Sequence, residues 1–381
     1  MKIVNICLAG PVTDGWNYQD NLLPKYQKML GNDVSVITSQ YIWNDKGQIE
    51  KSNKINYMNE FGVKVFRIPN IGKTNIFSKL KKYLGLYDLL EKLSPNLLFV
   101  HGCQFRDIST IVKYLKKNPG VVTYVDNHAD FSNSATTWLS KNILHKIIWR
   151  YYAKKINPYV KKWYGVLPAR VDFLKNVYGL PADKIEFLPM GVDDELVEKY
   201  STPEVRSEYR KKYGILDDDI LLVTGGKIDL AKKQTLLLMD AVNQIENIKL
   251  KLIVFGSVAP ELKDDVEKRC SERVKYIGWL SSEESYPHFA MADLVVFPGR
   301  HSVFWEQVAG QGIPMVVKYW PGTTHVDLGG NVKFLYAESV DEIKETIENI
   351  FFKGQLEKMK KAAVQSKNFF SYQNVAAMCL K

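Results

Sequence analysis

Glycines and lysines cluster after a short apolar run in the second half of this 381-residue chain. The string Thr224-Gly225-Gly226-Lys227 closes the apolar run 220–223, and Lys232 and Lys233 stand before a helical pattern. Glycine lets a backbone approach a ligand closely, and a lysine ammonium is a compact charge for phosphate oxygens. The string lacks the Walker pattern GxxxxGKS or GxxxxGKT, so it differs from a P-loop. It predicts a diphosphate cradle, with a solvated basic helix start as the alternative.

A second string, residues 297–314 (FPGRHSVFWEQVAGQGIP), joins a strand pattern to a helical one. Ser302 is a suitable N-cap for a helix that starts at Val303, and the first turn of such a helix offers free N–H groups to a phosphate. Glu306 and Gln307 lie about one turn further on, where a carboxylate or an amide can hold ribose hydroxyls. A glutamate that only complements the helix dipole is the alternative. The string predicts a second set of nucleotide-binding groups.

A glycine loop follows the first strand pattern of the chain. Gly10 and Gly15 bound residues 10–15 (GPVTDG), and Trp16 comes next. Loops after parallel strands face the ligand cleft of such sheets, so these residues are ligand candidates. A plain strand-to-helix turn is the alternative. The spacing GxGxxG is missing, which counts against a dinucleotide dehydrogenase.

A polar cluster follows the strand pattern 121–125 and contains Asn127, His128 and Asp130. Polar residues at the carboxyl end of a parallel strand are site candidates. His101 ends another strand pattern in the same way. A lone histidine is usually structural; here we favour function for His128 and structure for His101. The remaining histidines show no metal-ligand spacing, so we expect no metal.

Two series of alternating strand and helix patterns position these residues. Short apolar runs separated by helical stretches are typical of a parallel sheet with helices on both faces. Strand patterns occupy residues 2–8, 34–38, 63–68, 97–100, 121–125, 164–167 and 185–188, then 220–223, 249–255, 274–277, 294–297 and 315–317. The expected fold class is α/β, with two Rossmann-like doubly wound domains. Residues 1–197, completed by a terminal helix at 366–381, form the first, and residues 198–365 form the second.

Composition limits the function classes. Lys and Arg total 52 against 42 Asp and Glu, and the net charge of +10 favours an anionic partner. Four cysteines without a CxxC pair are typical of a reducing, cytoplasmic setting. We expect no signal peptide, which counts against a periplasmic binding protein, and find no apolar run of the ~20 residues that span a bilayer. No nucleic-acid-binding motif accompanies the charge, so we expect no nucleic-acid partner.

Basic and aromatic residues gather in two further stretches of the first half. Residues 149–164 and 78–93 mix lysine with tryptophan or tyrosine. This mixture suits the headgroup layer of an anionic membrane. An amphipathic helix that packs on the core is an equally good interpretation.

The strings together resemble retaining glycosyltransferases of the family 4 type, which have the GT-B fold, over nearly the whole chain. The glycine loop 10–15 and His128 match the family's first domain. Residues 189–193 (PMGVD) match its junction string P-x-G-V-D. Gly278 and Trp279 match the strand end that packs on the nucleotide base.

The family's diphosphate pair matches Gly226-Lys227 with Lys232 or Lys233. Counting back from the following helix favours Lys233, at the cost of a one-residue insertion. The region before Pro314 departs from the family pattern, which has two glutamates separated by seven residues. Only one glutamate, Glu306, is present here. Counting back from Gly312 and Pro314 places Gln307 at the position of the family's second glutamate. We expect Glu306 to hold the ribose, with Gln307 as the alternative.

The resemblance implies transfer of a sugar, hexosyl or N-acetylhexosaminyl, from a nucleotide diphosphate sugar, with UDP expected. The acceptor is a hydroxyl of a glycan or polyprenyl-linked oligosaccharide, as in bacterial surface polysaccharide or lipopolysaccharide synthesis. Lys227, Lys233 and the helix start at Ser302 and Val303 would stabilise the departing diphosphate without a metal or cofactor. His128 would contact the reacting sugar, and Trp16, Asn127 and Asp130 the acceptor. A cytoplasmic enzyme, peripheral on the inner face of the membrane, is expected. The alternative is a UDP-sugar 2-epimerase-like isomerase.

Overall fold

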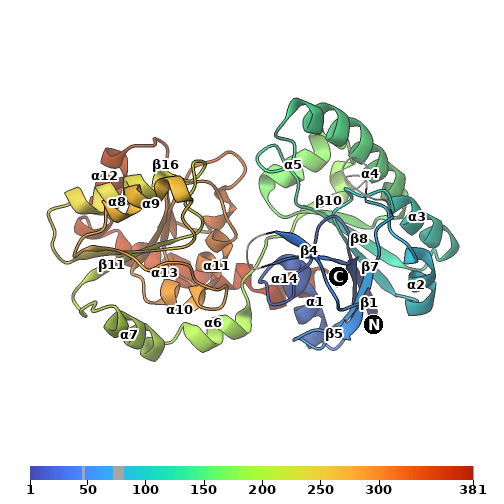
Figure 1. Ribbon diagram of the computed structural model, residues 1–381, viewed down its shortest axis with the longest axis horizontal. Coiled ribbons are helices and arrows are strands. Elements are labelled where there is room, and N and C mark those ends of the chain that lie inside the picture. Colours follow the sequence, from blue (N-terminus) through green and yellow to red (C-terminus); the bar gives the residue numbers. More distant parts are fainter. Residues whose placement is uncertain (45–47, 72–80, 381) are drawn as a thin grey trace. The chain divides into compact units, whose positions relative to one another are not determined.

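The chain divides into two compact units in a computed structural model that describes residues 1–44, 48–71 and 81–380. The first unit contains residues 1–189 and 375–381, and the second contains residues 190–374. The boundaries expected from the sequence, after residues 197 and 365, lie close to these. In each unit, helices cover both faces of one sheet (Figure 1).

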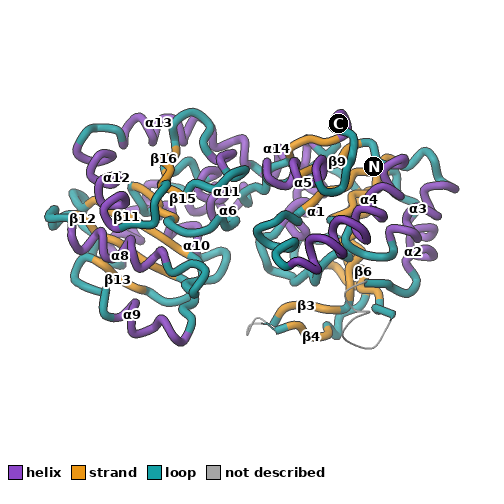
Figure 2. Tube along the Cα trace, turned by 90° about the horizontal axis from the view of Figure 1, so that it is seen from above, coloured by secondary structure: helices purple, strands orange, loops and turns teal. Residues whose placement is uncertain are grey.

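The first unit is built on an eight-stranded sheet in the order β10-β9-β8-β7-β1-β2-β6-β5. Seven of the strands run parallel, and β5 pairs antiparallel with β6 at the edge. Its strands are β1 (Lys2–Cys7), β2 (Asp33–Ser39), β5 (Asn56–Met58), β6 (Lys64–Ile68), β7 (Leu97–His101), β8 (Val122–Asn127), β9 (Lys162–Gly165) and β10 (Ile185–Phe187). A separate hairpin joins β3 (Tyr41–Trp43) to β4 (Ile49–Lys51) (Figure 2).

Helices of several kinds surround this sheet. They are α1 (Gln19–Met29), α2 (Leu86–Leu93), α3 (Ile108–Lys117), the π-helix η2 (Ser140–Trp149), α4 (Arg150–Ile156), η3 (Asn157–Tyr159), α5 (Pro168–Asn176) and η4 (Ala182–Lys184). The strand expected at 164–167 ends at Gly165, because Pro168 already occupies the first turn of α5. The expected stretch 78–93 includes residues 78–80, which lie outside the described residues.

The second unit has a six-stranded parallel sheet in the order β13-β12-β11-β14-β15-β16. Its strands are β11 (Ile220–Gly225), β12 (Leu250–Phe255), β13 (Val274–Tyr276), β14 (Leu294–Phe297), β15 (Met315–Lys318) and β16 (Val332–Leu335). The edge strand β16 was not expected from the sequence, because the exposed Lys333 interrupts its apolar run. The parallel strands of both sheets, alternating with helices, confirm the expected α/β fold class.

Helices also cover both faces of this sheet (Figure 1). They are α6 (Asp194–Tyr200), α7 (Pro203–Lys212), α8 (Gln234–Gln244), η5 (Pro260–Leu262), α9 (Lys263–Glu267), α10 (Ser285–Ala290), α11 (Phe304–Gly310), η6 (Thr324–Val326), α12 (Val340–Phe352), α13 (Leu356–Ser366) and η7 (Lys367–Phe370). Leu222 and Ile347 belong to the core on one face of the sheet, and Val223 and Trp305 to that on the other. Burial on both faces explains why the strands read as continuous apolar runs.

The junction string 189–193 has a packing role in the second unit. A Cβ on Gly191 would lie 2.7 Å from the carbonyl oxygen of Phe370, so only glycine fits there. The backbone N–H of Val192 donates to that same oxygen at 2.7 Å, and Asp193 caps α6 by accepting from Glu195. The string therefore fastens α6 to the segment that leads into α14 (Tyr372–Met378). Within the described residues, no helix is both long and apolar enough to cross a bilayer.

Candidate functional site

A hollow of about 330 Å³ opens at the carboxyl ends of β11 and β14 in the second unit. Gly226, Lys227 and Lys232 line it from the loop after β11, and Arg300 and Ser302 line it from the loop after β14. The carboxyl ends of parallel strands are where open α/β sheets bind ligands. The hollow thus brings together residues from both strings that the sequence analysis singled out.

Two glycines leave the backbone exposed or closely packed at this hollow. Gly226 has a φ of +128°, which side-chain-bearing residues rarely adopt, and open space lies where its Cβ would be. A Cβ on Gly225 would lie 2.1 Å from the ring of Phe255. One glycine therefore lets the loop pack closely on β12, and the other presents unshielded backbone to a ligand.

Three cations share the rim of the hollow. Burial lowers the pKa of Lys232, and repulsion from Lys227 and Arg300 lowers that pKa further, against the opposing effect of Asp229. Asp229 lies 3.3 Å from the ammonium of Lys227 and offsets part of the charge. Like charges held together in this way favour a bound anion, because an anion removes their mutual repulsion.

The structure places the two candidate lysines differently. Lys232 is half-buried and lines the hollow, whereas Lys233 is exposed and does not line it. Lys232 is therefore the better placed of the two at the hollow, and a diphosphate contact by Lys233 stays a prediction. Arg300 was missed, although its position just after the strand 294–297 was a usable signal.

The helix start differs from the expected one. Helix α11 begins at Phe304, its N-cap position is Val303, and no side chain caps it. Ser302 contributes its backbone oxygen to Trp305 rather than a capping hydroxyl, which corrects its predicted role as N-cap. Ser302 nevertheless lines the hollow, and nucleotide contacts by Ser302 and Val303 stay a prediction.

Glu306 is fully buried and bonded to two histidines instead of facing a ligand. Its Oε1 lies 2.8 Å from Nε2 of His301 and 2.8 Å from Nε2 of His325. Burial would raise the pKa of Glu306, but His301 and His325 outweigh it and hold the pKa well below its usual value. Gln307 is also buried and bonds to Ser285 at 2.9 Å. Both side chains thus bond within the second unit, and ribose contact by Glu306 or Gln307 stays a prediction.

Gly278 and Trp279 follow β13 beside the glycine loops. The carbonyl of Gly278 accepts from the N–H of Gly256 at 2.7 Å, and Gly278 has a φ of +84°. The indole of Trp279 is 70% exposed, which leaves a large face free for stacking. Base contact by these two residues stays a prediction.

His128 belongs to a polar network at the carboxyl ends of β1, β7 and β8 in the first unit. Its Nε2 lies 3.1 Å from Oδ2 of the fully buried Asp126. Nδ1 of His101 lies 3.0 Å from the same oxygen. Asp20, from α1, lies 3.2 Å from His101. Sequence reasoning gave Asp126 no role, although it lies near the end of β8, two residues before His128.

Asn127 and Asp130, the expected acceptor-side residues, are used inside the fold. Asn127 is fully buried and accepts from Gln104 at 3.1 Å, and Asp130 is 4% exposed and pairs with Arg170 at 3.1 Å. Both side chains therefore have structural partners, and acceptor contact by either stays a prediction. Asp130 also accepts from Ser132.

The glycine loop of the first unit is also braced internally. The N–H of Gly15 donates to Glu60 at 2.7 Å, so it is not free for an anion. Trp16 is half-buried with its ring edge-on to Tyr18. Gly10 has open space around its Cβ position. Ligand contacts by Gly10 and Trp16 stay predictions.

Side chains that could coordinate a metal gather at two places in the described part of the chain: around His101 in the first unit and around Glu306 in the second. At both places hydrogen bonds already connect the groups. We interpret both as hydrogen-bonded networks, and the expectation that no metal takes part stays a prediction.

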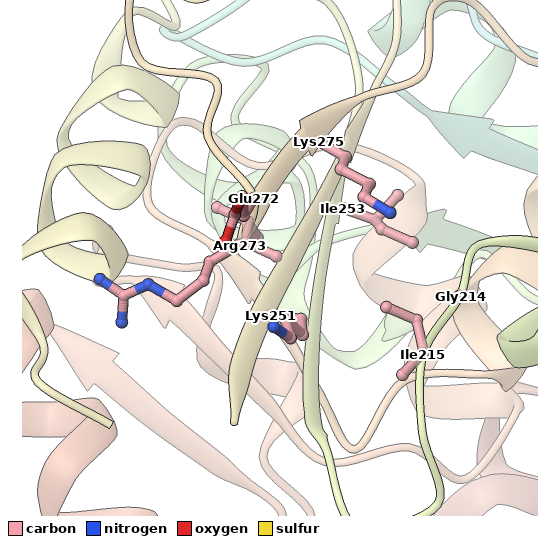
Figure 3. A pocket seen from close by; sticks show the side chains of 8 residues that line it. Gly214, Ile215, Lys251, Ile253, Glu272, Arg273 and Lys275 are labelled. Atoms are coloured by element: carbon pink, nitrogen blue, oxygen red, sulfur yellow. The ribbon is translucent and has the colours of Figure 1, made fainter. Parts of the chain in front are cut away.

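A second hollow, of about 270 Å³, lies at the opposite strand ends of β12 and β13 (Figure 3). Lys251, Arg273 and Lys275 line it. The guanidinium of Arg273 donates to backbone carbonyls at the end of α8, and Lys275 donates to the carbonyl of Tyr213. Two of its cations therefore donate to backbone carbonyls, whereas in the cluster beside Gly226 Lys227 pairs with the carboxylate of Asp229.

Comparison with known proteins identifies the class. Residues 219–353 match the family model described as group 1 glycosyl transferases. An uncharacterized glycosyltransferase of Methanocaldococcus jannaschii is 21% identical over 150 residues, which are 37% of this chain and 38% of that protein. The aligned region thus spans well under half of this curated relative.

Solved structures resemble the chain over its whole length. A glycosyltransferase from Rickettsia africae has a TM-score of 0.71 at 14% identity, covering 100% of this chain and 96% of that one. HepE of Anabaena, solved in complex with UDP, has a TM-score of 0.69 at 15% identity, covering 100% and 98%. A UDP-GlcNAc 2-epimerase from Neisseria meningitidis, bound to UDP-GlcNAc, has a TM-score of 0.63 at 14% identity, covering 100% and 98%.

The chain therefore has the GT-B fold, as the sequence resemblance implied. More particularly, residues 219–353, which match the model of group 1 glycosyl transferases, include every group that lines the cationic hollow.

Proposed function

We propose that this protein is a retaining glycosyltransferase that uses a UDP-sugar donor. The observation that carries the proposal is the cationic hollow, in which Lys227, Lys232 and Arg300 surround bare glycine backbone within the matched domain. A departing nucleoside diphosphate carries negative charge that such preorganised cations stabilise. HepE, of the same fold, was solved with UDP, which supports uridine as the base.

The donor sugar is a hexose or an N-acetylhexosamine, and the acceptor is a hydroxyl of a glycan or polyprenyl-linked oligosaccharide. Lys232, Arg300 and Lys227 take the charge of the leaving diphosphate, so the reaction proceeds without a divalent metal. Retention of the anomeric configuration follows from the family resemblance, with attack from the face that the leaving phosphate occupies. We assign His128, on the first unit, to a hydroxyl of the reacting sugars.

One assay tests this function against its rival. The purified protein is incubated, with chelator present, with UDP-, GDP- and ADP-sugars, and released nucleotide and sugar products are measured. Slow UDP release from one donor supports a metal-free transferase and selects that donor for an acceptor search. Conversion of a UDP-sugar to its epimer without UDP release favours the isomerase, whose candidacy rests on the epimerase of the same fold. If UDP neither is released nor raises the unfolding temperature, the proposal fails.

We further propose that the first unit attaches to an anionic membrane surface, in keeping with a lipid-linked acceptor and synthesis of surface polysaccharide on the cytoplasmic side. Around η2, Trp138 is 72% exposed, and Leu139 and Ile147 are each 58% exposed. Lys141 and Lys146 lie on the same π-helix. Exposed apolar residues flanked by lysines are the pattern of interfacial helices.

Sedimentation with vesicles tests this attachment. We expect binding to phosphatidylglycerol vesicles and not to phosphatidylcholine vesicles, and a loss of that binding in Trp138→Ser. Trp279→Ser is the matched control, because Trp279 is equally exposed, at 70%, but lies on the second unit. Equal loss in both variants, or no binding by the parent protein, would refute the attachment.

A further inference from the structure

Asp126 has the contacts of a residue that orients another side chain. It is fully buried at the end of β8. Its Oδ1 accepts from the N–H of Gly102 at 2.8 Å. Its Oδ2 accepts from Gln19 at 3.1 Å and lies 3.0 Å from His101 and 3.1 Å from His128. A carboxylate held from this many sides has a single position, and whatever bonds to it inherits that position.

Asp126 is ionised in this environment. Burial alone would raise the pKa of Asp126, but the charges of His128 and His101 and the hydrogen bonds from both rings outweigh burial and hold that pKa below its usual value. An ionised carboxylate accepts hydrogen bonds and donates none. Each histidine nitrogen that faces Asp126 must therefore carry a proton.

His101 balances the buried charge. Burial opposes its protonation, yet the carboxylate of Asp126 outweighs burial and holds the pKa of His101 well above its ordinary value. Burial raises the pKa of the Cys7 thiol to about 11, so the thiol stays neutral at pH 7. Nε2 of His101 bonds to Asn5 Oδ1 at 3.2 Å, and Nδ1 lies within ion-pair distance of Asp126. His101 is therefore a structural counter-charge for Asp126.

His128 differs from His101 because its side chain is 38% exposed. A neutral imidazole has one donor and one acceptor nitrogen, and the partner of one nitrogen fixes the role of the other. With Nε2–H directed at Asp126, the lone pair of His128 lies on Nδ1.

We propose that Asp126 is a positioning residue that holds His128 in the Nε2–H form, so that Nδ1 accepts a hydrogen bond from a substrate hydroxyl. The hydroxyl belongs to a reacting sugar, and this part of the proposal rests on the proposed function. The orientation and the tautomer of His128 do not depend on that function, so they can be tested separately.

Nitrogen-15 NMR of the histidine side chains tests the orientation in the full chain without any substrate. The His128 resonances are assigned by their loss in His128→Gln. In the parent protein at a pH where the ring is neutral, we expect the Nε2–H form with its proton protected from exchange with water. In Asp126→Asn we expect a tautomer mixture and fast exchange. A freely exchanging Nε2 proton in the parent protein, or a His128 signal unchanged in Asp126→Asn, would overturn the proposal.

A double-mutant cycle tests whether Asp126 acts through His128. With UDP-glucose as the first donor tried, we expect Asp126→Asn to lower kcat by roughly a hundredfold, the scale of one oriented proton-accepting group, with KM little changed. Adding Asp126→Asn to His128→Ala should cost less than threefold more. Asp107→Asn is the control, because Asp107 is a buried carboxylate of the same unit whose partners are Thr110 and Tyr83.

The two experiments distinguish failure of the positioning role of Asp126 from failure of the proposed function. Additive losses in the cycle, or an equal fall in kcat for Asp107→Asn, would overturn the positioning role. If the Nε2–H signal is protected but UDP is neither released from any UDP-sugar nor raises the unfolding temperature, the proposed function is overturned and the orientation of His128 is left intact.

Discussion

The adjacent lysines of the second unit offer a matched pair of charge deletions. Lys232 is half-buried on the rim of the hollow, and Lys233 is exposed outside it. Each change to alanine removes one positive charge at nearly the same place in the chain. A difference in UDP binding between Lys232→Ala and Lys233→Ala therefore reports on position and not on net charge.

The structure sets the expected magnitudes. A hydrogen bond to a charged group in a partly buried site is worth about 1.5–3 kcal/mol, so Lys232→Ala should weaken UDP binding by roughly 10- to 150-fold. An exposed charge contributes about 0–1 kcal/mol, so Lys233→Ala should weaken binding less than about fivefold. The Lys232 effect should also shrink as salt increases, since added ions screen the contact.

Stability should change in the opposite direction. Lys232 is partly desolvated and repelled by Lys227 and Arg300, so its removal relieves an unfavourable arrangement in the ligand-free protein. We expect the unfolding temperature of Lys232→Ala to be unchanged or raised while UDP affinity falls. A residue that binds ligand at the expense of stability behaves in this way.

Isothermal titration of UDP with chelator present, at two salt concentrations, measures the affinities, and thermal unfolding without nucleotide measures stability. Equal losses of affinity in the two variants would show that net charge, not the hollow, governs binding. A larger loss in Lys233→Ala would return Lys233 to the site and refute our placement of the diphosphate.

Three further predictions concern stability. Burial lowers the pKa of His145 to about 4, so the unfolded chain takes up this proton at a higher pH than the folded protein, and stability should fall by up to about 3 kcal/mol as pH drops from 6.5 to 4. Urea unfolding at pH 7 and 5 measures this fall, and His145→Gln should flatten the dependence on pH. Glu306→Gln removes the partner of His301 and His325 and should cost about 3–5 kcal/mol in urea unfolding, while the Kd for UDP should change less than threefold; a tenfold rise would instead support ribose contact. Gly191→Ala should cost about 1–3 kcal/mol in thermal unfolding because its Cβ meets the Phe370 carbonyl, whereas Gly120→Ala, with nothing within 4 Å, should cost less than about 1 kcal/mol.

Sequence patterns predicted the architecture well because they report on burial along the chain. Apolar runs such as 220–223 and 294–297 became adjacent strands β11 and β14, and the loops after them met at one hollow. The edge strand β16 was missed because the exposed Lys333 interrupts its apolar run. Periodicity detects elements whose faces are fully buried and misses those at the margin of a sheet.

Side-chain direction was the part that the sequence could not supply. Asn127, Asp130 and Glu306 are polar residues at strand ends or in a first helical turn, which is where site residues stand, yet each turns inward to a structural partner. The sequence does not show that Gln104, Arg170 and His301 lie next to these three residues. Lys232 and Lys233 differ by one position, and only the turn before α8 decides which of them lies at the rim.

The end of α14 has a consequence for the order in which the protein is made. Residues 375–381 belong to the first unit, and Val375, Ala376 and Cys379 are completely buried. The first unit leaves the ribosome early but lacks this segment until the entire second unit has been synthesised. The core of the first unit is therefore incomplete during synthesis, so a fragment ending at Pro189 should expose apolar surface and require chaperones. The second unit, in contrast, can fold as soon as its own residues have been synthesised.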